Sequence, residues 1–263
     1  MLVETGDNVG IGGFIITGTA PKQVLLRGIG PSLAGSGVPD PLADPILELH
    51  GPPGFPTIIN DNWMDWCTSG LPQMPPCFPP GALLPPGNPL ESFIGLWLDP
   101  GAYTAILKGK NNGVGVGLVE VYDLNQTAGK LGNISTRAFV NTGANIMIAG
   151  FILGGNSGAD NVIVRGIGPS LTAFGVPNAL ADPTLELRNS NGALILANDN
   201  WQDNAAQAAL ISAAGLAPTN PLESAIAATL SPGLYTALLA GLNSGTGVGL
   251  VEFYDLGGTL ALP

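Results

Sequence analysis

Hydrophobic and polar residues alternate over short segments of this chain, and turn-forming residues separate the segments. At positions 46–50 the alternation places Leu47 and Leu49 on one face and Glu48 and His50 on the other. Such segments predict β-strands. In the first half of the chain they occupy residues 12–17, 24–27, 46–50, 56–59, 92–98, 103–108 and 115–122.

The second half of the chain repeats the first. Val24–Leu33 recurs as Val162–Leu171, 138 residues later. Asn88–Ser92 recurs as Asn220–Ser224 after only 132 residues, so the first copy holds six additional residues before Asn88. A repeat of this length corresponds to a whole domain and not to a solenoid unit.

The two patterns together predict an all-β fold of two tandem antiparallel β-sandwiches, jelly-roll-like, that arose by internal duplication. We place the domains at residues 1–128 and 129–263. One short helix is expected in the second domain over residues 204–214, where helix-forming residues precede Gly215.

Composition narrows the function classes. Eight basic and 19 acidic residues give a net charge of −11, so we expect neither nucleic acid nor an anionic membrane surface as a partner. No apolar run is long enough to span a bilayer. The one histidine, His50, aligns with Arg188 of the second copy, which argues against a catalytic triad. We predict that the protein is not an enzyme, although Asp61, Asp65 and Glu91 could formally supply the paired carboxylates of a glycosidase.

Side-chain oxygens gather after one predicted strand of each copy. Calcium binds six to eight oxygen ligands, which makes calcium the one candidate cofactor, with Asp44 and Asp182 as additional ligands. An Asx-rich turn that satisfies its own backbone explains the same residues. The candidate ligands are Asn60, Asp61, Asn62, Asp65, Asn198, Asp199, Asn200 and Asp203.

A tryptophan, Trp63 or Trp201, follows each of these polar groups. Exposed, it would offer a platform for a cell-surface glycan; half-buried, it would belong to the core. Tyr103 and Tyr235 each follow a Pro-Gly turn at the start of a strand, which resembles a tyrosine corner. Arg27–Ser32 lacks the residues of a phosphate loop and is interpreted as a strand end with a turn.

Each copy also places one arginine and one glutamate within apolar strands. We predict two partly buried ion pairs, Arg27 with Glu120 and Arg165 with Glu252, which would contribute to the specificity of packing.

The composition is typical of an exported protein, and we expect an extracellular or cell-surface location, with the leader absent from this chain. Cys67 and Cys77 are then expected to form a disulfide within a proline-rich loop. Asn125 and Asn133 match the acceptor pattern for N-glycosylation.

Residues 131–140 predict an extra strand in the second copy, and the first copy retains only residues 2–6 of the equivalent region. A sandwich that lacks a strand exposes unpaired backbone. A strand from another subunit or a rearrangement can cover it, and a chain that is a shortened piece of a longer array explains the missing strand equally well. The residues we assign to such contacts are Leu2, Val3, Leu260 and Leu262.

Three motifs in order carry a family resemblance: Asp44-Pro-x-Leu-Glu-Leu, Asn60-Asp-Asn and Pro100-Gly-x-Tyr-Thr. They resemble bacterial pre-peptidase C-terminal domains, which are non-catalytic β-sandwiches attached to secreted enzymes. Related collagen-binding modules include some that bind calcium. The fuller pattern resembles a tandem repeat of large secreted and surface proteins of environmental bacteria.

The sequence therefore predicts a non-catalytic extracellular structural protein. It would be a subunit of a filament, stalk or array, joined by head-to-tail contacts and strand contribution. The alternative is an extracellular carbohydrate- or surface-binding module.

Overall fold

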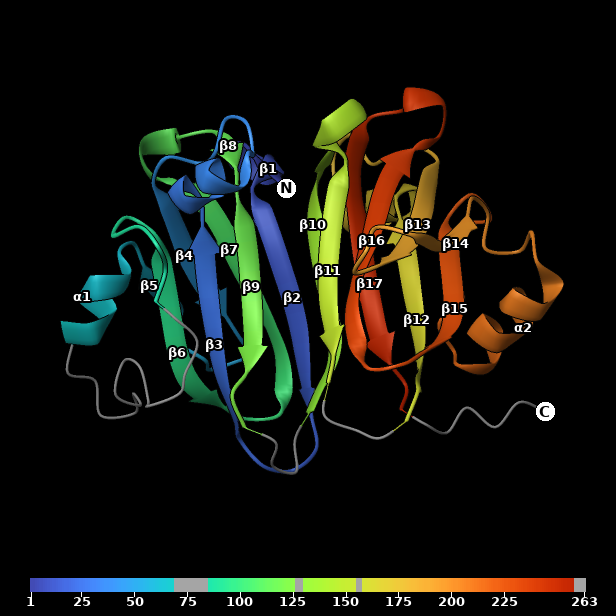
Figure 1. The fold of residues 1–263 in the computed structure, drawn as a ribbon, viewed down its shortest axis with the longest axis horizontal. Coiled ribbons are helices and arrows are strands. Elements are labelled where there is room, and N and C mark those ends of the chain that lie inside the picture. Colours follow the sequence, from blue (N-terminus) through green and yellow to red (C-terminus); the bar gives the residue numbers. More distant parts are fainter. Residues whose placement is uncertain (69–84, 126–129, 155–157, 258–263) are drawn as a thin grey trace. The chain divides into compact units, whose positions relative to one another are not determined.

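A computed structural model describes residues 1–68, 85–125, 130–154 and 158–257 (Figure 1). The chain forms two units, Leu2–Ile134 and Ser135–Pro263, called here the N-terminal and C-terminal units. Both consist mainly of antiparallel strands, which confirms the predicted all-β fold. The boundary lies inside β10 (Lys130–Val140), whereas the sequence placed it at 128/129.

The N-terminal unit has two sheets packed face to face. Its elements are β1 (Leu2–Val3), β2 (Gly10–Thr17), β3 (Lys22–Ile29), β4 (Pro45–His50), β5 (Ile58–Asn60), α1 (Trp63–Thr68), β6 (Ser92–Leu98), β7 (Gly101–Gly109), β8 (Gly115–Val116) and β9 (Leu118–Asp123). One sheet has the order β2-β7-β4-β5. The other has the order β6-β3-β9, and β1 pairs with β8.

The C-terminal unit repeats this plan. After β10 its elements are β11 (Met147–Leu153), β12 (Asp160–Ile167), β13 (Pro183–Asn189), β14 (Leu194–Asn198), α2 (Ala205–Ala213), β15 (Ser224–Leu230), β16 (Gly233–Gly241) and β17 (Gly247–Asp255). The sheets have the orders β11-β16-β13-β14 and β15-β12-β17-β10. Numbered along the unit, this is 2-7-4-5 against 1-8-3-6, the strand order of a jelly roll.

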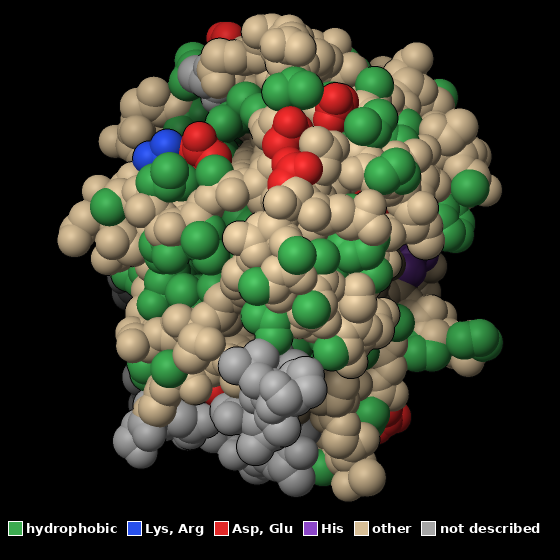
Figure 2. All heavy atoms as spheres, turned by 90° about the vertical axis from the view of Figure 1, so that its right-hand side faces the viewer, with side chains coloured by type: hydrophobic (Ala, Val, Ile, Leu, Met, Phe, Trp, Pro, Cys, Tyr) green, Lys and Arg blue, Asp and Glu red, His purple; other side chains and the backbone are tan. Residues whose placement is uncertain are grey.

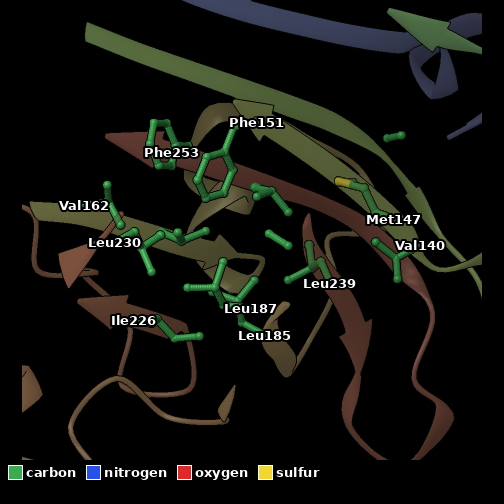
Figure 3. Close-up of a cluster of buried hydrophobic side chains, with 14 of the residues drawn as sticks. Val140, Met147, Phe151, Val162, Leu185, Leu187, Ile226, Leu230, Leu239 and Phe253 are labelled. Atoms are coloured by element: carbon green, nitrogen blue, oxygen red, sulfur yellow. The ribbon is translucent and has the colours of Figure 1, made fainter. Parts of the chain in front are cut away.

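The core of each unit lies between its two sheets. Leu47 and Leu49 are fully buried while the side chain of His50 is 41% exposed, as the alternation predicts. In the C-terminal unit Figure 3 shows Phe151, Leu187 and their neighbours converging from both sheets. Burial of these apolar side chains is the main stabilising contribution to each unit.

Tyrosine corners form in both units. The hydroxyl of Tyr103 donates to the carbonyl of Asp99 at 2.9 Å, and that of Tyr235 donates to Ser231 at 2.7 Å. The ring of Tyr103 stacks on Phe14 with centroids 5.4 Å apart. Each tyrosine thus ties the turn before its strand to the core.

The expected helix is α2. The side chain of Asn204 caps it by accepting from the amides of Ala206 and Gln207, and Gly215 ends it with a φ of +69°. The sequence did not predict α1, which is shorter and begins at Trp63. In the described ranges no helix combines the length and apolar content needed to cross a membrane.

Figure 2 shows that few charged side chains lie on the face that carries α2, and that apolar side chains are dispersed over it.

We expect Leu187→Ala to lower the free energy of unfolding of the C-terminal unit by roughly 2–5 kcal/mol, because Leu187 is fully buried between the sheets. Leu234→Ala is the matched control, since Leu234 is 54% exposed; it should change stability by less than about 0.5 kcal/mol. Chemical denaturation of both variants measures the difference, and equal losses would contradict the assigned core.

Candidate functional site

A buried glutamate organises the loops at one end of each sandwich. Glu91 has no accessible surface. One carboxylate oxygen accepts from the amides of Gly30 (3.1 Å) and Ser32 (2.9 Å), and the other accepts from the Ser32 hydroxyl (2.8 Å). In the C-terminal unit one oxygen of Glu223 accepts from all three equivalent donors, the amides of Gly168 and Ser170 and the Ser170 hydroxyl.

The turn that follows Arg27 is therefore an anion-binding turn whose anion is a carboxylate of the chain itself. Gly30 is required there, because a Cβ atom would lie 2.1 Å from the carbonyl oxygen of Leu42. The sequence predicted a strand end with a turn at Arg27–Ser32, and the carboxylate bound there was not predicted. The available signal was the exact repetition of Asn88–Ser92 in the second copy.

The Asn-Asp-Asn-Trp loop (60–63, and 198–201 in the second copy) is held by the residue that begins it. Asn60 accepts from the amide of Phe93 at 2.8 Å and donates to the carbonyl of Asn62 at 3.0 Å. The amide of Trp63 donates to the carbonyl of Glu91 at 2.8 Å. Asn198 binds Ala225 and Asn200 in the same way. The side-chain oxygens of Asn60 and Asn198 thus each accept a hydrogen bond from the backbone, as the alternative of an Asx-rich turn expects.

The remaining acidic residues converge beside this loop. Asp44 and Asp61 approach Lys110, whose Nζ lies 3.6 Å from Asp44 Oδ2 and 2.6 Å from Asp61 Oδ2. Burial and the negative charge of Asp61 raise the pKa of Asp44, against the opposing effect of Lys110. The carboxylate of Asp65 accepts from the side chain of Asn62 at 3.4 Å.

The C-terminal unit brings Asp182 and Asp199 together at the equivalent position. Burial raises the pKa of Asp199, and the negative charges of Asp182 and Asp203 raise it further. Throughout the described residues, no three His, Cys, Asp or Glu side chains are placed to hold a metal ion on their own. A cation here would need amide or backbone oxygens as well.

The two tryptophans are half-buried. Trp201 packs against the cluster of Ile163, Ile211 and Ala225 that α2 forms with the outer face of its sheet. For Trp201 this contact favours the interpretation as a core residue over that as a platform for a sugar.

Arg27 and Glu120 face each other on paired strands, with side chains 16% and 21% exposed and 2.6 Å between Arg27 Nη2 and Glu120 Oε2. The Tyr122 ring lies 5.2 Å from the guanidinium, and its hydroxyl donates to Glu120 at 3.0 Å. The same arrangement recurs in Arg165, Glu252 and Tyr254.

The residues considered for catalysis make structural contacts. His50 Nε2 lies 3.5 Å from Glu48, and the Thr57 hydroxyl lies 3.3 Å from His50 Nδ1. Glu91 is enclosed by its turn, and Asp61 pairs with Lys110. These contacts account for the positions of the carboxylates without a substrate.

The predicted disulfide and the predicted contacts of the C-terminal tail involve residues outside the described ranges. Cys77, Leu260 and Leu262 lie outside the described residues, and only the backbone of Cys67 is described, so the disulfide and the tail contacts stay predictions. Asn133 is only 6% exposed, and the side-chain nitrogen of Asn125 is buried. Glycosylation of the folded chain is therefore disfavoured at both.

The burial of Lys22 was not predicted from the sequence either. Its side chain is 1% exposed, and Nζ reaches Asp123 Oδ2 at 2.6 Å and the carbonyl of Asn125 at 2.7 Å. The second copy has Asp160 at this position, so repetition gave no signal.

We expect Glu223→Gln to lower the stability of the C-terminal unit by about 3 kcal/mol, because an amide removes a charged acceptor and turns N–H groups toward the amides of the turn. Glu186→Gln is the control: its partner Arg188 lies at the surface, and the loss should stay below about 1 kcal/mol. Denaturant unfolding of the two variants tests this, and equal losses would show that Glu223 does not anchor the turn.

Burial and the charge of Glu252 raise the pKa of Tyr254 to about 12. The Tyr254 hydroxyl therefore stays protonated in the folded chain at pH values at which it is deprotonated in the unfolded chain. The contribution of Tyr254 to stability is complete below the unfolded-state pKa of 10.0 and is lost as the pH rises to about 12. Tyr254→Phe should make stability less dependent on pH across this interval, as thermal unfolding at several pH values would show. An unchanged pH dependence would contradict the assignment.

No family model matches the chain, and no curated protein matches it. The resemblance to pre-peptidase C-terminal domains therefore stays a prediction from the sequence. Any functional assignment rests on the geometry described above.

Proposed function

We propose that the chain is a non-catalytic structural protein, located outside the cell, that assembles with other copies of itself by strand pairing. The observation that carries the proposal is the second edge of β9 in the N-terminal unit. Its duplicate, β17, lies between two strands, β12 and β10. β9 pairs with β3 alone, and no described strand of the N-terminal unit covers its other edge.

Burial follows this difference in pairing. Val251 and Phe253 of β17 are 1% and 8% exposed. The equivalent Val119 and Val121 of β9 are only half-buried, and Leu118 is 37% exposed. An edge with free backbone groups and partly exposed apolar side chains is a template for another strand.

β1 shows where an added strand would run. Leu2 pairs with Val116 and Val3 with Gly115 in antiparallel register, and Val3 is fully buried. Leu2 and Val3 therefore complete their own unit, and we assign the assembly contact to β9 instead. A strand continuing the line of β1 would pass along β9 as β10 passes along β17.

The alternative, a carbohydrate-binding module, has less support. It relies on exposed tryptophans, and Trp201 packs against its own unit. Trp201 is therefore not free to act as a platform for the expected glycan partner.

The test places a copy of Lys130–Ala138 directly before Leu2. Because Val3 corresponds to Val140, this segment would continue β1 along β9 and give the N-terminal unit its own first strand. We expect the parent chain to form concentration-dependent oligomers in size-exclusion chromatography with light scattering, and the extended chain to stay monomeric. Negative-stain electron microscopy would show whether the oligomers are filaments.

The matched control carries the same extension with proline at the copied positions of Ile134 and Thr136, which removes amide donors from the pairing strand. This control should associate like the parent. A parent chain that is monomeric at every concentration, or oligomers that the intact extension leaves unchanged, would refute strand-mediated assembly.

A further inference from the structure

The C-terminal unit leaves open a strand edge that the N-terminal unit covers. β2 and β11 are duplicates, in which Ile11 and Ile15 recur as Ile148 and Ile152. β2 lies between two strands, β7 and β10. β11 pairs with β16 alone, and no described strand of its unit covers its other edge. Side-chain exposure follows this difference, since Ile15 is 37% exposed and Ile152 is 68% exposed.

Two other edges of the C-terminal unit carry features that hinder pairing. On β15 the amide of Ala225 donates to the side chain of Asn198 at 2.8 Å, and the amide of Ala227 donates to Gln207 at 2.7 Å. These amides are therefore not available to another strand. On the opposite sheet the register between β13 and β14 shifts after Leu187, an irregularity that disturbs the ladder at that edge.

β11 has none of the features that keep native edges from pairing. Its seven residues, Met147–Leu153, include no charge and no proline, and their register with β16 is continuous. Ile148 and Ile152 are both more than half exposed. A long, regular and apolar edge of this kind is a template for another strand.

β10 shows which edges a strand of this chain covers. It begins in the N-terminal unit, where it neighbours β2 and the Thr17 hydroxyl donates to the carbonyl of Lys130 at 3.3 Å. It ends in the C-terminal unit, where it neighbours β17. β2 is the duplicate of β11, and β17 is the duplicate of β9. The edges that β10 covers are therefore of the same two kinds that β11 and β9 leave open.

We propose that the open edge of β9 in one copy pairs with the open edge of β11 in another copy. This inference rests on the proposed function and names the partner strand of the same site. The contact brings no unpaired charge to the interface, because Glu120 and Asp123 of β9 already pair with Arg27 and Lys22. Since the two edges differ, the contact is heterologous, and every bound copy keeps one open edge for the next copy.

The first test adds charge to β11. We expect Ile148→Lys/Ile152→Lys to raise the dissociation constant of self-association at least tenfold in sedimentation velocity, because lysines on an edge strand oppose pairing. The matched control is Leu194→Lys/Leu234→Lys, which adds two lysines to the same sheet at similarly exposed residues of β14 and β16. This control should associate like the parent.

The second test mixes two chains that each have one edge blocked. The chain extended by the copy of Lys130–Ala138 keeps β11 open, and Ile148→Lys/Ile152→Lys keeps β9 open. At a concentration that assembles the parent, each should be monomeric alone, and the mixture should form one-to-one dimers that do not grow further. Dimers of either chain alone would show that like edges pair with each other and would overturn the inference, as would the absence of mixed dimers.

The outcomes also separate this inference from the proposed function. A parent chain that is monomeric at every concentration would refute the assembly and β11 as its partner together. Assembly that the extension abolishes, but that Ile148→Lys/Ile152→Lys leaves as strong as in its control, would overturn β11 alone.

Discussion

The buried carboxylate of Glu91, with Glu223 in the second copy, is the contact on which the loop end of each sandwich depends. The carboxylate of Glu91 accepts a hydrogen bond from an amide of the turn that follows β3. The backbone carbonyl of Glu91 accepts another from the amide of Trp63, which follows β5. The next residue begins β6. One residue thus connects strands from both sheets, and it sets the positions of the loops beside the acidic pair.

The alternation of hydrophobic and polar residues and the turn residues predicted much of the fold. Alternation placed Leu47 and Leu49 in the core, and the turn before Tyr103 indicated its hydrogen bond to Asp99. The pairing of Arg27 with Glu120 across two strands was predictable, because each residue is a charge within an apolar segment. These features depend on neighbouring residues or on one ladder, which a sequence reveals directly.

Features that depend on distant segments were not predictable. The amides that bind Glu91 belong to a turn with no distinctive side chain, and 59 positions separate Ser32 from it. Lys22 looked like an ordinary strand terminus, yet the fold encloses it with Asp123. The ion pairs of Lys110 with Asp44 and Asp61 were not predictable either, because the two aspartates lie beside other strands.

The order of strands has a mechanical consequence. The first and last strands of a jelly roll are neighbours in one sheet, as β1 and β8 are here in antiparallel register and as β10 lies beside β17. The chain therefore enters and leaves such a sandwich at the same end. When its two ends are pulled apart, the hydrogen bonds between these strands are loaded one after another, as in a zip, instead of sharing the force along the whole ladder.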